Sequence, residues 1–271
     1  MNAPALTTRH AILDRRNAGG IATLTLNDPA SRNSLSEAML AALSDTFAAI
    51  ADDRSVRAVV LAAVGPCFSS GHNLKEMTAR RADPDRGRAY FTEVMRRCAA
   101  MMQQIVALPQ PVIAAVQGLA TAAGCQLVAT CDLAVASDQA RFCTPGVNIG
   151  LFCSTPMVAL SRNVAPKHAM EMLLVGDVIT AADAFRMGLV NRVVPAGEEL
   201  GAAEALAARI AAKSALTVKI GKRAFYDQID MRLSEAYAHA SAVMVENMLA
   251  RDAEEGIGAT LEKRQPRWED R

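Results

Sequence analysis

Several features that would direct this chain toward particular partners are missing from its 271 residues. Lys plus Arg number 29 against 28 Asp plus Glu, so there is no basic surplus to attract nucleic acid and no acidic tail for a basic partner. No run of about 18 apolar residues is present to span a bilayer. We therefore expect no nucleic-acid partner and no membrane partner.

The first residues also lack the apolar stretch of a secretory signal, and Asp14 interrupts the basic cluster there. We expect neither a signal nor a transit peptide. The six cysteines include no CxxC pair and lie in apolar segments, which favours reduced core residues over a disulfide framework. We predict a reducing, cytoplasmic location and no metal site. The cysteines are Cys67, Cys98, Cys125, Cys131, Cys143 and Cys153.

Hydrophobic residues make up 51% of the chain and charged residues 21%, which is ordinary for a globular protein. No internal repeat, low-complexity block or long linker divides the sequence. Strands and helices alternate up to the middle of the chain, and the remainder is mostly helical. We predict one α/β core over residues 1–200 and a helical C-terminal region over residues 201–271.

Short apolar runs and helical spacing locate the main elements. Ile21–Leu26 should be a strand that closes a hairpin at Gly19-Gly20, and Ser36 should cap a helix over Glu37–Ala51. Further strands are predicted at 58–64, 112–116 and 133–136, and helices at 88–108, 126–130, 202–210 and 233–249. Residues 80–88 are charged and contain Gly and Pro, which indicates a surface loop.

Two small-residue turns each follow a buried strand. The first covers residues 68–74 (FSSGHNL) and the second covers residues 117–126 (QGLATAAGCQ). Small residues let a ligand approach the backbone closely, and amides near 122–124 would lie at a helix N-terminus, where they favour an anionic oxygen. Close packing between helix and strand explains the same pattern when it is taken alone.

The whole set of motifs resembles the crotonase (enoyl-CoA hydratase/isomerase) superfamily over residues 21–263. The matching segments are NDP at 27–29 with RNSL at 32–35, residues 68–77, residues 122–132, TA at 180–181 with GLV at 188–190, and LEKR at 261–264. The resemblance implies an α/β spiral of ββα units and a backbone oxyanion hole for a thioester oxygen. It places the two donor amides on Ser70 and Ala123.

Hydration of an enoyl-CoA requires a carboxylate to activate water and an acid to protonate the α carbon. By resemblance, those two positions hold Gln126 and Gly146 in this chain. Gln126 can orient water but cannot take its proton, and it can equally serve only to satisfy backbone groups. Ordinary hydratase activity is therefore in doubt.

His72 lies in the first turn, two residues after Ser70, and its side chain either enters the pocket mouth or is an exposed loop histidine. The SGH sequence resembles decarboxylating members of the superfamily, in which the histidine places a carboxylate and no base is needed. The tyrosine that those members carry corresponds to Cys153 here. Cys153 should line the acyl side of the pocket, where a buried, unreactive thiol is the simpler interpretation.

The resemblance also implies how coenzyme A is held. It places Arg32 and Lys263 near the nucleotide phosphates, with Lys263 often reaching across a subunit boundary. It further implies a homotrimer or a dimer of trimers, an acyl-CoA substrate that carries coenzyme A, and no prosthetic group. The remaining residues expected to line the coenzyme site are Ser69, Ser70, Gly71, His72, Asn73 and Leu74.

Two hypotheses from different classes fit a retained hole with missing carboxylates. The first is an acyl-CoA enzyme of the hydratase type, or a decarboxylase, in which Gln126 or His72 places water or a substrate carboxylate. The second is an acyl-CoA-binding pseudoenzyme that sequesters or senses thioesters. RNA binding by a crotonase relative is disfavoured by the balanced charge.

Overall fold

The computed structural model describes residues 7–10 and 12–271. The strands form a seven-stranded sheet in the order β1-β2-β3-β4-β6-β8-β11 and a four-stranded sheet in the order β10-β9-β7-β5. The expectation that no targeting segment precedes the core concerns in part residues 1–6, which lie outside the described residues. The strands are β1 Thr7–His10, β2 Leu13–Ala18, β3 Ile21–Leu26, β4 Ala58–Ala63, β5 Cys67–Ser69, β6 Val112–Val116, β7 Leu119–Thr121, β8 Leu133–Ser137, β9 Arg141–Cys143, β10 Ile179–Thr180 and β11 Arg192–Val194.

Successive chain segments repeat one pattern. β4, β6 and β8 are parallel neighbours in the large sheet, and β5, β7 and β9, each of which follows one of them, are parallel neighbours in the small sheet. A helix follows the first two strand pairs, α2 after β5 and α4 after β7. This arrangement is the spiral of ββα units that the sequence predicts.

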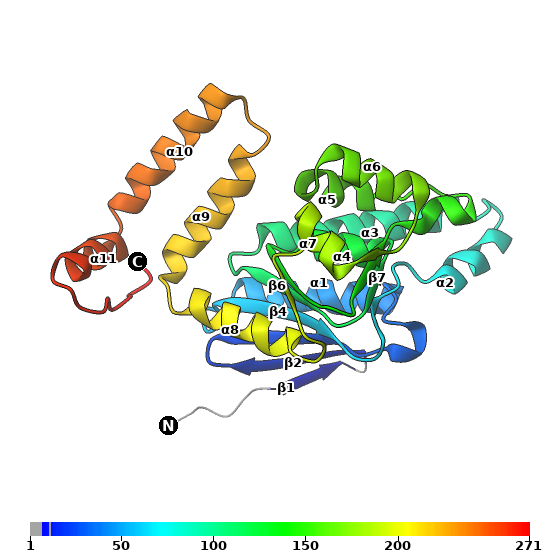
Figure 1. Cartoon of the computed structure of the whole chain (residues 1–271), viewed down its shortest axis with the longest axis horizontal. Helices are drawn as coiled ribbons and strands as arrows, with labels where there is room; N and C mark the ends of the chain where they lie inside the picture. The colour runs from blue at the N-terminus through cyan, green and yellow to red at the C-terminus, as the bar shows by residue number, and fades with distance from the viewer. Residues whose placement is uncertain (1–6, 11) are drawn as a thin grey trace.

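Helices cover both faces of the large sheet (Figure 1). On one face, Val59 and Leu61 of β4 join the main core with α1, α3 and α4, whereas Ala58, Val60 and Ala62 point to the other face, against α8. The alternation follows from the period of two in a strand. The helices are α1 Glu37–Ala51, α2 Leu74–Ala79, α3 Arg88–Ala107, α4 Ala123–Thr130, α5 Pro156–Asn163, α6 Pro166–Val175, α7 Ala181–Met187, α8 Glu199–Ala211, α9 Ala215–Gln228, α10 Leu233–Met248 and α11 Arg251–Leu261, with 3-10 helices η1 Pro29–Ser31, η2 Arg80–Ala82 and η3 Pro145–Ile149.

The expected division after residue 200 falls inside α8. Ala203 and Ala207 of α8 are fully buried against the large sheet, so this helix is part of the core packing. The helices α9, α10 and α11, which we call the arm, follow α8, and α9 and α10 project away from the sheets (Figure 1). Neither α9 nor α10 contains a fully buried residue.

Most longer elements agree with the sequence-based expectations. α1 spans the expected residues, and the Ser36 hydroxyl accepts a hydrogen bond from the Met39 amide at 3.2 Å. The expected loop at 80–88 begins with η2, where the Arg80 guanidinium lies 5.0 Å from the Tyr90 ring centroid. The six cysteines are buried and unpaired, as expected for core residues. No helix in the described part of the chain is long and apolar enough to cross a membrane.

The segment between β3 and α1 braces the first turn. Asn33 is completely buried in the left-handed conformation, with φ of 52°. Its side-chain nitrogen donates to the carbonyls of Val64 at 2.9 Å and Cys67 at 2.8 Å, and its oxygen accepts from the Asp28 amide at 2.8 Å. Asn33 therefore holds the end of β4 and the start of β5 in place.

We expect Asn33→Ala to lower the free energy of unfolding by about 3 kcal/mol, because it leaves buried backbone groups unpaired and puts a less tolerant residue at positive φ. Urea denaturation measures the change. Asn17→Ala is the matched control, since among the described residues the Asn17 side chain makes one hydrogen bond, which it accepts from Arg15 on the outer hairpin at 3.0 Å. A loss as small as that of the control would show that Asn33 does not brace the turn.

Candidate functional site

The two small-residue turns meet through their backbones. A Cβ atom on Gly124 would lie 2.1 Å from the Ser69 carbonyl oxygen, and one on Gly71 would lie 2.9 Å from the Ala123 nitrogen. Gly71 also has φ of +80°, which L side chains rarely adopt. Glycine at both positions is what allows the end of β5 to lie directly against the start of α4.

The amides at this junction are not equivalent. The Ser70 amide donates to the Arg32 carbonyl at 3.0 Å, so it is already engaged and is poorly suited to be the hole donor that the sequence suggested. The amides of His72 and Ala123 have no hydrogen-bond partner among the described residues. Ala123 is the first residue of α4, where the backbone leaves its N–H free and the helix dipole favours negative charge.

Ala122 precedes α4 in a conformation that is normally restricted to glycine. Its φ and ψ are 52° and -120°, and its amide donates to the Cys143 carbonyl at 3.0 Å. Backbone geometry of this kind costs about 1 to 3 kcal/mol and persists only where the surroundings enforce it. This conformation produces a sharp turn directly before α4. The Ala123 amide is therefore the first N–H of the helix, and it has no partner among the described residues.

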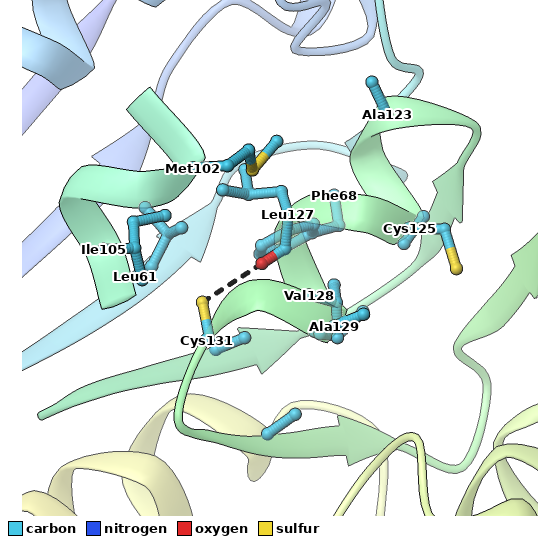
Figure 2. Packing of buried hydrophobic residues seen from close by; sticks show 14 of the residues in the cluster. Leu61, Phe68, Met102, Ile105, Ala123, Cys125, Leu127, Val128, Ala129 and Cys131 are labelled. Carbon is cyan, nitrogen blue, oxygen red and sulfur yellow. Dashed lines mark hydrogen bonds between the residues drawn. The ribbon is translucent and has the colours of Figure 1, made fainter. Parts of the chain in front are cut away.

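Helix α4 is buried along its whole length. Figure 2 shows Leu127 beside Phe68 and Met102, with Leu61 and Ile105 in the same cluster. This packing against β4, β5 and α3 fixes the helix in the core and leaves its N-terminus at the junction of the turns.

Gln126 lies in the first half of α4 and is only 5% exposed. Its backbone is engaged, with its amide donating to Ala122 and its carbonyl accepting from the Thr130 hydroxyl. Its side-chain oxygen is buried without a hydrogen-bond partner in the described chain. The interpretation that Gln126 serves only to satisfy nearby backbone groups therefore finds no support.

The His72 side chain turns inward from the first turn. Its Nε2 atom is buried and has no partner among the described residues, and burial lowers the pKa of the imidazole. A lowered pKa keeps the ring neutral at neutral pH, with one nitrogen as donor and the other as acceptor. Both unpartnered side-chain groups, on His72 and Gln126, are thus uncharged.

Gly146 lies in η3, and the Cys153 thiol occupies the space beside it. A Cβ atom at position 146 would lie 2.9 Å from the Cys153 sulfur and 3.0 Å from the Leu151 carbonyl oxygen. Burial raises the pKa of the Cys153 thiol, so the neutral, weakly nucleophilic form dominates. A side chain at position 146 would therefore require Cys153 or the Leu151 backbone to shift.

The structure separates the two cations expected at the coenzyme. Arg32 is exposed beside the first turn, whereas Lys263 is exposed just after α11, at the opposite end of the molecule from α2 (Figure 1). One chain does not bring them together.

A buried polar cluster was missed from the sequence. Asp132 follows α4 and binds Lys222 and Tyr226 of α9. The spacing of four between Lys222 and Tyr226 places them on one helix face, but nothing in the sequence identifies Asp132 as their partner.

We expect Gly146→Ala to lower the free energy of unfolding by about 1 to 3 kcal/mol, because the added methyl group overpacks the contact with Cys153 and Leu151. Gly201→Ala is the matched control, since nothing lies within 4 Å of a Cβ at that position in α8. The control should be neutral or slightly stabilising. Thermal denaturation compares the two, and equal stability would contradict the close packing at Gly146.

Solved structures of similar sequence have the same fold. A crystal structure of an enoyl-CoA hydratase from Mycobacterium smegmatis is 52% identical, with a TM-score of 0.88 over 97% of this chain and 98% of that chain. The crystal structure of human enoyl-CoA hydratase domain-containing protein 3 is 47% identical, with a TM-score of 0.90 over 95% of this chain and 100% of that chain.

Similar sequences correct the expected location. The protein from Rattus norvegicus named enoyl-CoA hydratase domain-containing protein 3, mitochondrial, is 47% identical over 93% of this chain and 83% of its own length. Relatives of the same name from Xenopus laevis and Homo sapiens are 49% and 47% identical. Because these relatives are named as mitochondrial, the expectation of a cytoplasmic location is wrong. That expectation rested on six cysteines interpreted as reduced and on the lack of a recognisable signal or transit segment, and neither observation identifies a compartment.

The family model described as Enoyl-CoA hydratase/isomerase matches residues 16–271, which is nearly the whole chain. Together with the relatives above, this match means that the chain belongs to the enoyl-CoA hydratase/isomerase family, with the crotonase fold.

Proposed function

We propose that this protein is an acyl-CoA enzyme of the hydratase-like lyase type, which holds a thioester in a backbone oxyanion hole and stabilises its enolate. The observation that carries the proposal is the contact between Gly71 and the free amide of Ala123 at the N-terminus of a buried helix. A thioester α proton is weakly acidic, so enolate chemistry needs fixed donors aimed at the oxygen. Rigid backbone amides meet that requirement.

The hole donors that we propose are the amides of Ala123 and His72. Ser70 is less suitable, because its amide would have to give up the Arg32 carbonyl before it could bind a substrate oxygen. The His72 amide requires no such exchange and lies directly after Gly71, which contacts Ala123. Ser70 then serves to brace the turn.

Proton transfer is the step for which this site is least equipped. We propose that Gln126 orients a water molecule or a substrate group through its unpartnered oxygen, and that Gly146 supplies no acid. Decarboxylation of a malonyl-type thioester is the alternative that needs no base, since the hole takes up the charge as carbon dioxide leaves. The buried, unpartnered Nε2 of His72 favours it, because that nitrogen is available to position a carboxylate.

A non-catalytic role is the third candidate. Both unpartnered side chains described at the junction, His72 and Gln126, are neutral, and neither offers a strong base at neutral pH. A protein of this kind would bind an acyl-CoA through the hole without turning it over.

For coenzyme A itself, we propose contacts from Arg32 and from the turn that contains Ser69, Ser70, Gly71, His72, Asn73 and Leu74. Lys263 lies too far away within one chain to join them (Figure 1), so we propose that it reaches coenzyme A held by another copy. Coenzyme A enters as part of the substrate, and we propose no prosthetic group.

We propose a homotrimer or a dimer of trimers. The arm leaves a cavity of about 610 Å³ between α9, α10 and α11, lined by Met244, Ile257 and Trp268 among others. Large apolar side chains are exposed on the arm and on the segment from η3 to α7, and burial of such surface between copies is favourable. Those side chains include Phe225, Leu233, Tyr237, Met244, Leu249 and Leu261 on the arm, and Ile149, Leu174, Val178 and Phe185 elsewhere.

The first test is to incubate the purified protein with a short 2-enoyl-CoA, a malonyl-type CoA ester and a saturated acyl-CoA, and to identify products by mass. We expect enolate chemistry on at least one of the first two and none on the saturated ester. Hydration far above background would mean that another group replaces the glutamates, and carbon dioxide release would select decarboxylation. Tight binding without any product would support the pseudoenzyme instead.

The second test removes one hole donor. Ala123→Pro deletes the amide N–H at the first helical position, but its ring also crowds Gly71 and the strained Ala122, so thermal stability is measured alongside turnover. We expect turnover to fall by about 10² to 10³-fold, which is the usual effect of losing one such donor. Ala123→Gly, which keeps the N–H, is the control and should stay within a few-fold. Equal activity of the two variants, with circular dichroism unchanged, would exclude Ala123 from the hole.

A further inference from the structure

A largely buried polar cluster, which we call the tether, joins helix α9 of the arm to the core. The Lys222 Nζ atom donates to Asp132 Oδ2 at 2.7 Å and to the carbonyls of Ile105 at 2.9 Å and Gln110 at 3.1 Å. Tyr226, one helical turn later on α9, donates from its hydroxyl to Asp132 Oδ1 at 2.9 Å. All three Lys222 donors and both Asp132 oxygens are therefore engaged.

The tether is unusual for its surroundings. The Lys222 and Asp132 side chains are 6% and 15% exposed, although α9 contains no fully buried residue. Burial lowers the pKa of Lys222 and the Asp132 carboxylate opposes that shift, so the ammonium depends on its partner. A charge in such surroundings needs close partners, so the ion pair restricts the relative positions of α9 and Asp132. The cluster therefore helps to set how α9 meets the core, together with Arg57, which binds Asp270 and the Ala211 and Lys213 carbonyls at the start and end of the arm.

Asp132 connects the tether to the candidate site. It follows Cys131, which caps α4 and whose thiol donates to the Leu127 carbonyl at 3.3 Å (Figure 2). Asp132 Oδ2 also accepts from the amide of Val112, the first residue of β6, at 2.7 Å. The other end of the same buried helix presents the Ala123 amide and Gln126. Because α4 is buried along its whole length, a shift of Asp132 along the helix axis would also move the N-terminal end of α4, at the junction of the two turns.

We propose that Lys222 and Tyr226 are positioning residues, which couple the seating of the arm to the placement of the Ala123 amide and Gln126 through Asp132 and α4. The expected effect on ligand binding rests on the proposed function. The mechanical coupling between the arm and α4 does not depend on it. An arm that is displaced, or not yet packed on another copy, would then loosen the start of α4.

The experiment compares the full-length wild type with Lys222→Met, which removes the charge but keeps the length of the side chain. Lys222→Arg tests rescue, because it restores a cation at the same place. Lys219→Met is the matched control, since Lys219 is exposed on the same helix and loses the same charge. Hydrogen exchange read by mass spectrometry follows a peptide spanning residues 117–130, with residues 13–26 as an internal reference. Titration with butyryl-CoA measures binding.

We expect Lys222→Met to speed exchange at residues 126–130, whose amides are the hydrogen-bonded ones of α4, by about tenfold, with the reference peptide unchanged. Butyryl-CoA should bind about tenfold more weakly, which corresponds to about 1.4 kcal/mol. Lys222→Arg should recover much of both effects, and Lys219→Met should match the wild type. Faster exchange only in α9, with residues 117–130 unchanged, would overturn the coupling, because the tether would then hold the arm alone.

Two further comparisons keep the outcomes separate. If Lys222→Met does not fold, Tyr226→Phe is the replacement variant, because it removes a single hydrogen bond and keeps the ion pair. The proposal then requires a smaller rise in exchange at residues 126–130. If the wild type does not bind butyryl-CoA, the proposed function fails, and the exchange comparison still decides whether the arm and α4 are coupled. A uniform rise in exchange over both peptides would indicate general destabilisation and contradict the proposal.

Discussion

The candidate site depends on one contact between two stretches of backbone, where the Ser69 carbonyl lies against Gly124 and Gly71 lies against the Ala123 nitrogen. Side chains at either glycine would push the turns apart. The contact explains the other features around it, including the left-handed Asn33 that braces the first turn and the strained Ala122 that begins α4. A site made of backbone depends on the packing of the whole core, because backbone donors cannot adjust by changing rotamer.

The polar groups at the two ends of α4 differ in whether they have hydrogen-bond partners. At the N-terminus, the candidate site contains amides and neutral side chains that have no partner among the described residues. Past the C-terminus, Asp132, Lys222 and Tyr226 are fully engaged with one another. Removal of one partner from a buried ion pair costs about 3 to 5 kcal/mol, so this end of the helix is tightly held. The arm, in contrast, carries many of the large apolar side chains that are exposed in the described chain.

Sequence patterns located the long elements and missed the short ones. The strands at β4, β6 and β8 are apolar runs, and the Glu37–Ala51 helix has clear caps and periodicity. β5, β7 and β9 span three residues each, which is too short for any period. β5 and β7 overlap segments that the sequence predicted as turns, and no element was predicted at β9. The resemblance brought the two turns together but placed a donor on Ser70, whose engagement by Arg32 is a long-range hydrogen bond. Asp132 was missed for the same reason, since its partners lie 90 residues or more away.

The packing of Cys153 against Gly146 couples two parts of the chain. A Cβ atom at position 146 would meet the Cys153 sulfur and the Leu151 carbonyl oxygen, so a side chain there requires this segment to shift. The glycine and the conformation of residues 151–153 therefore depend on each other. A redesign of this side of the candidate site would have to change both together.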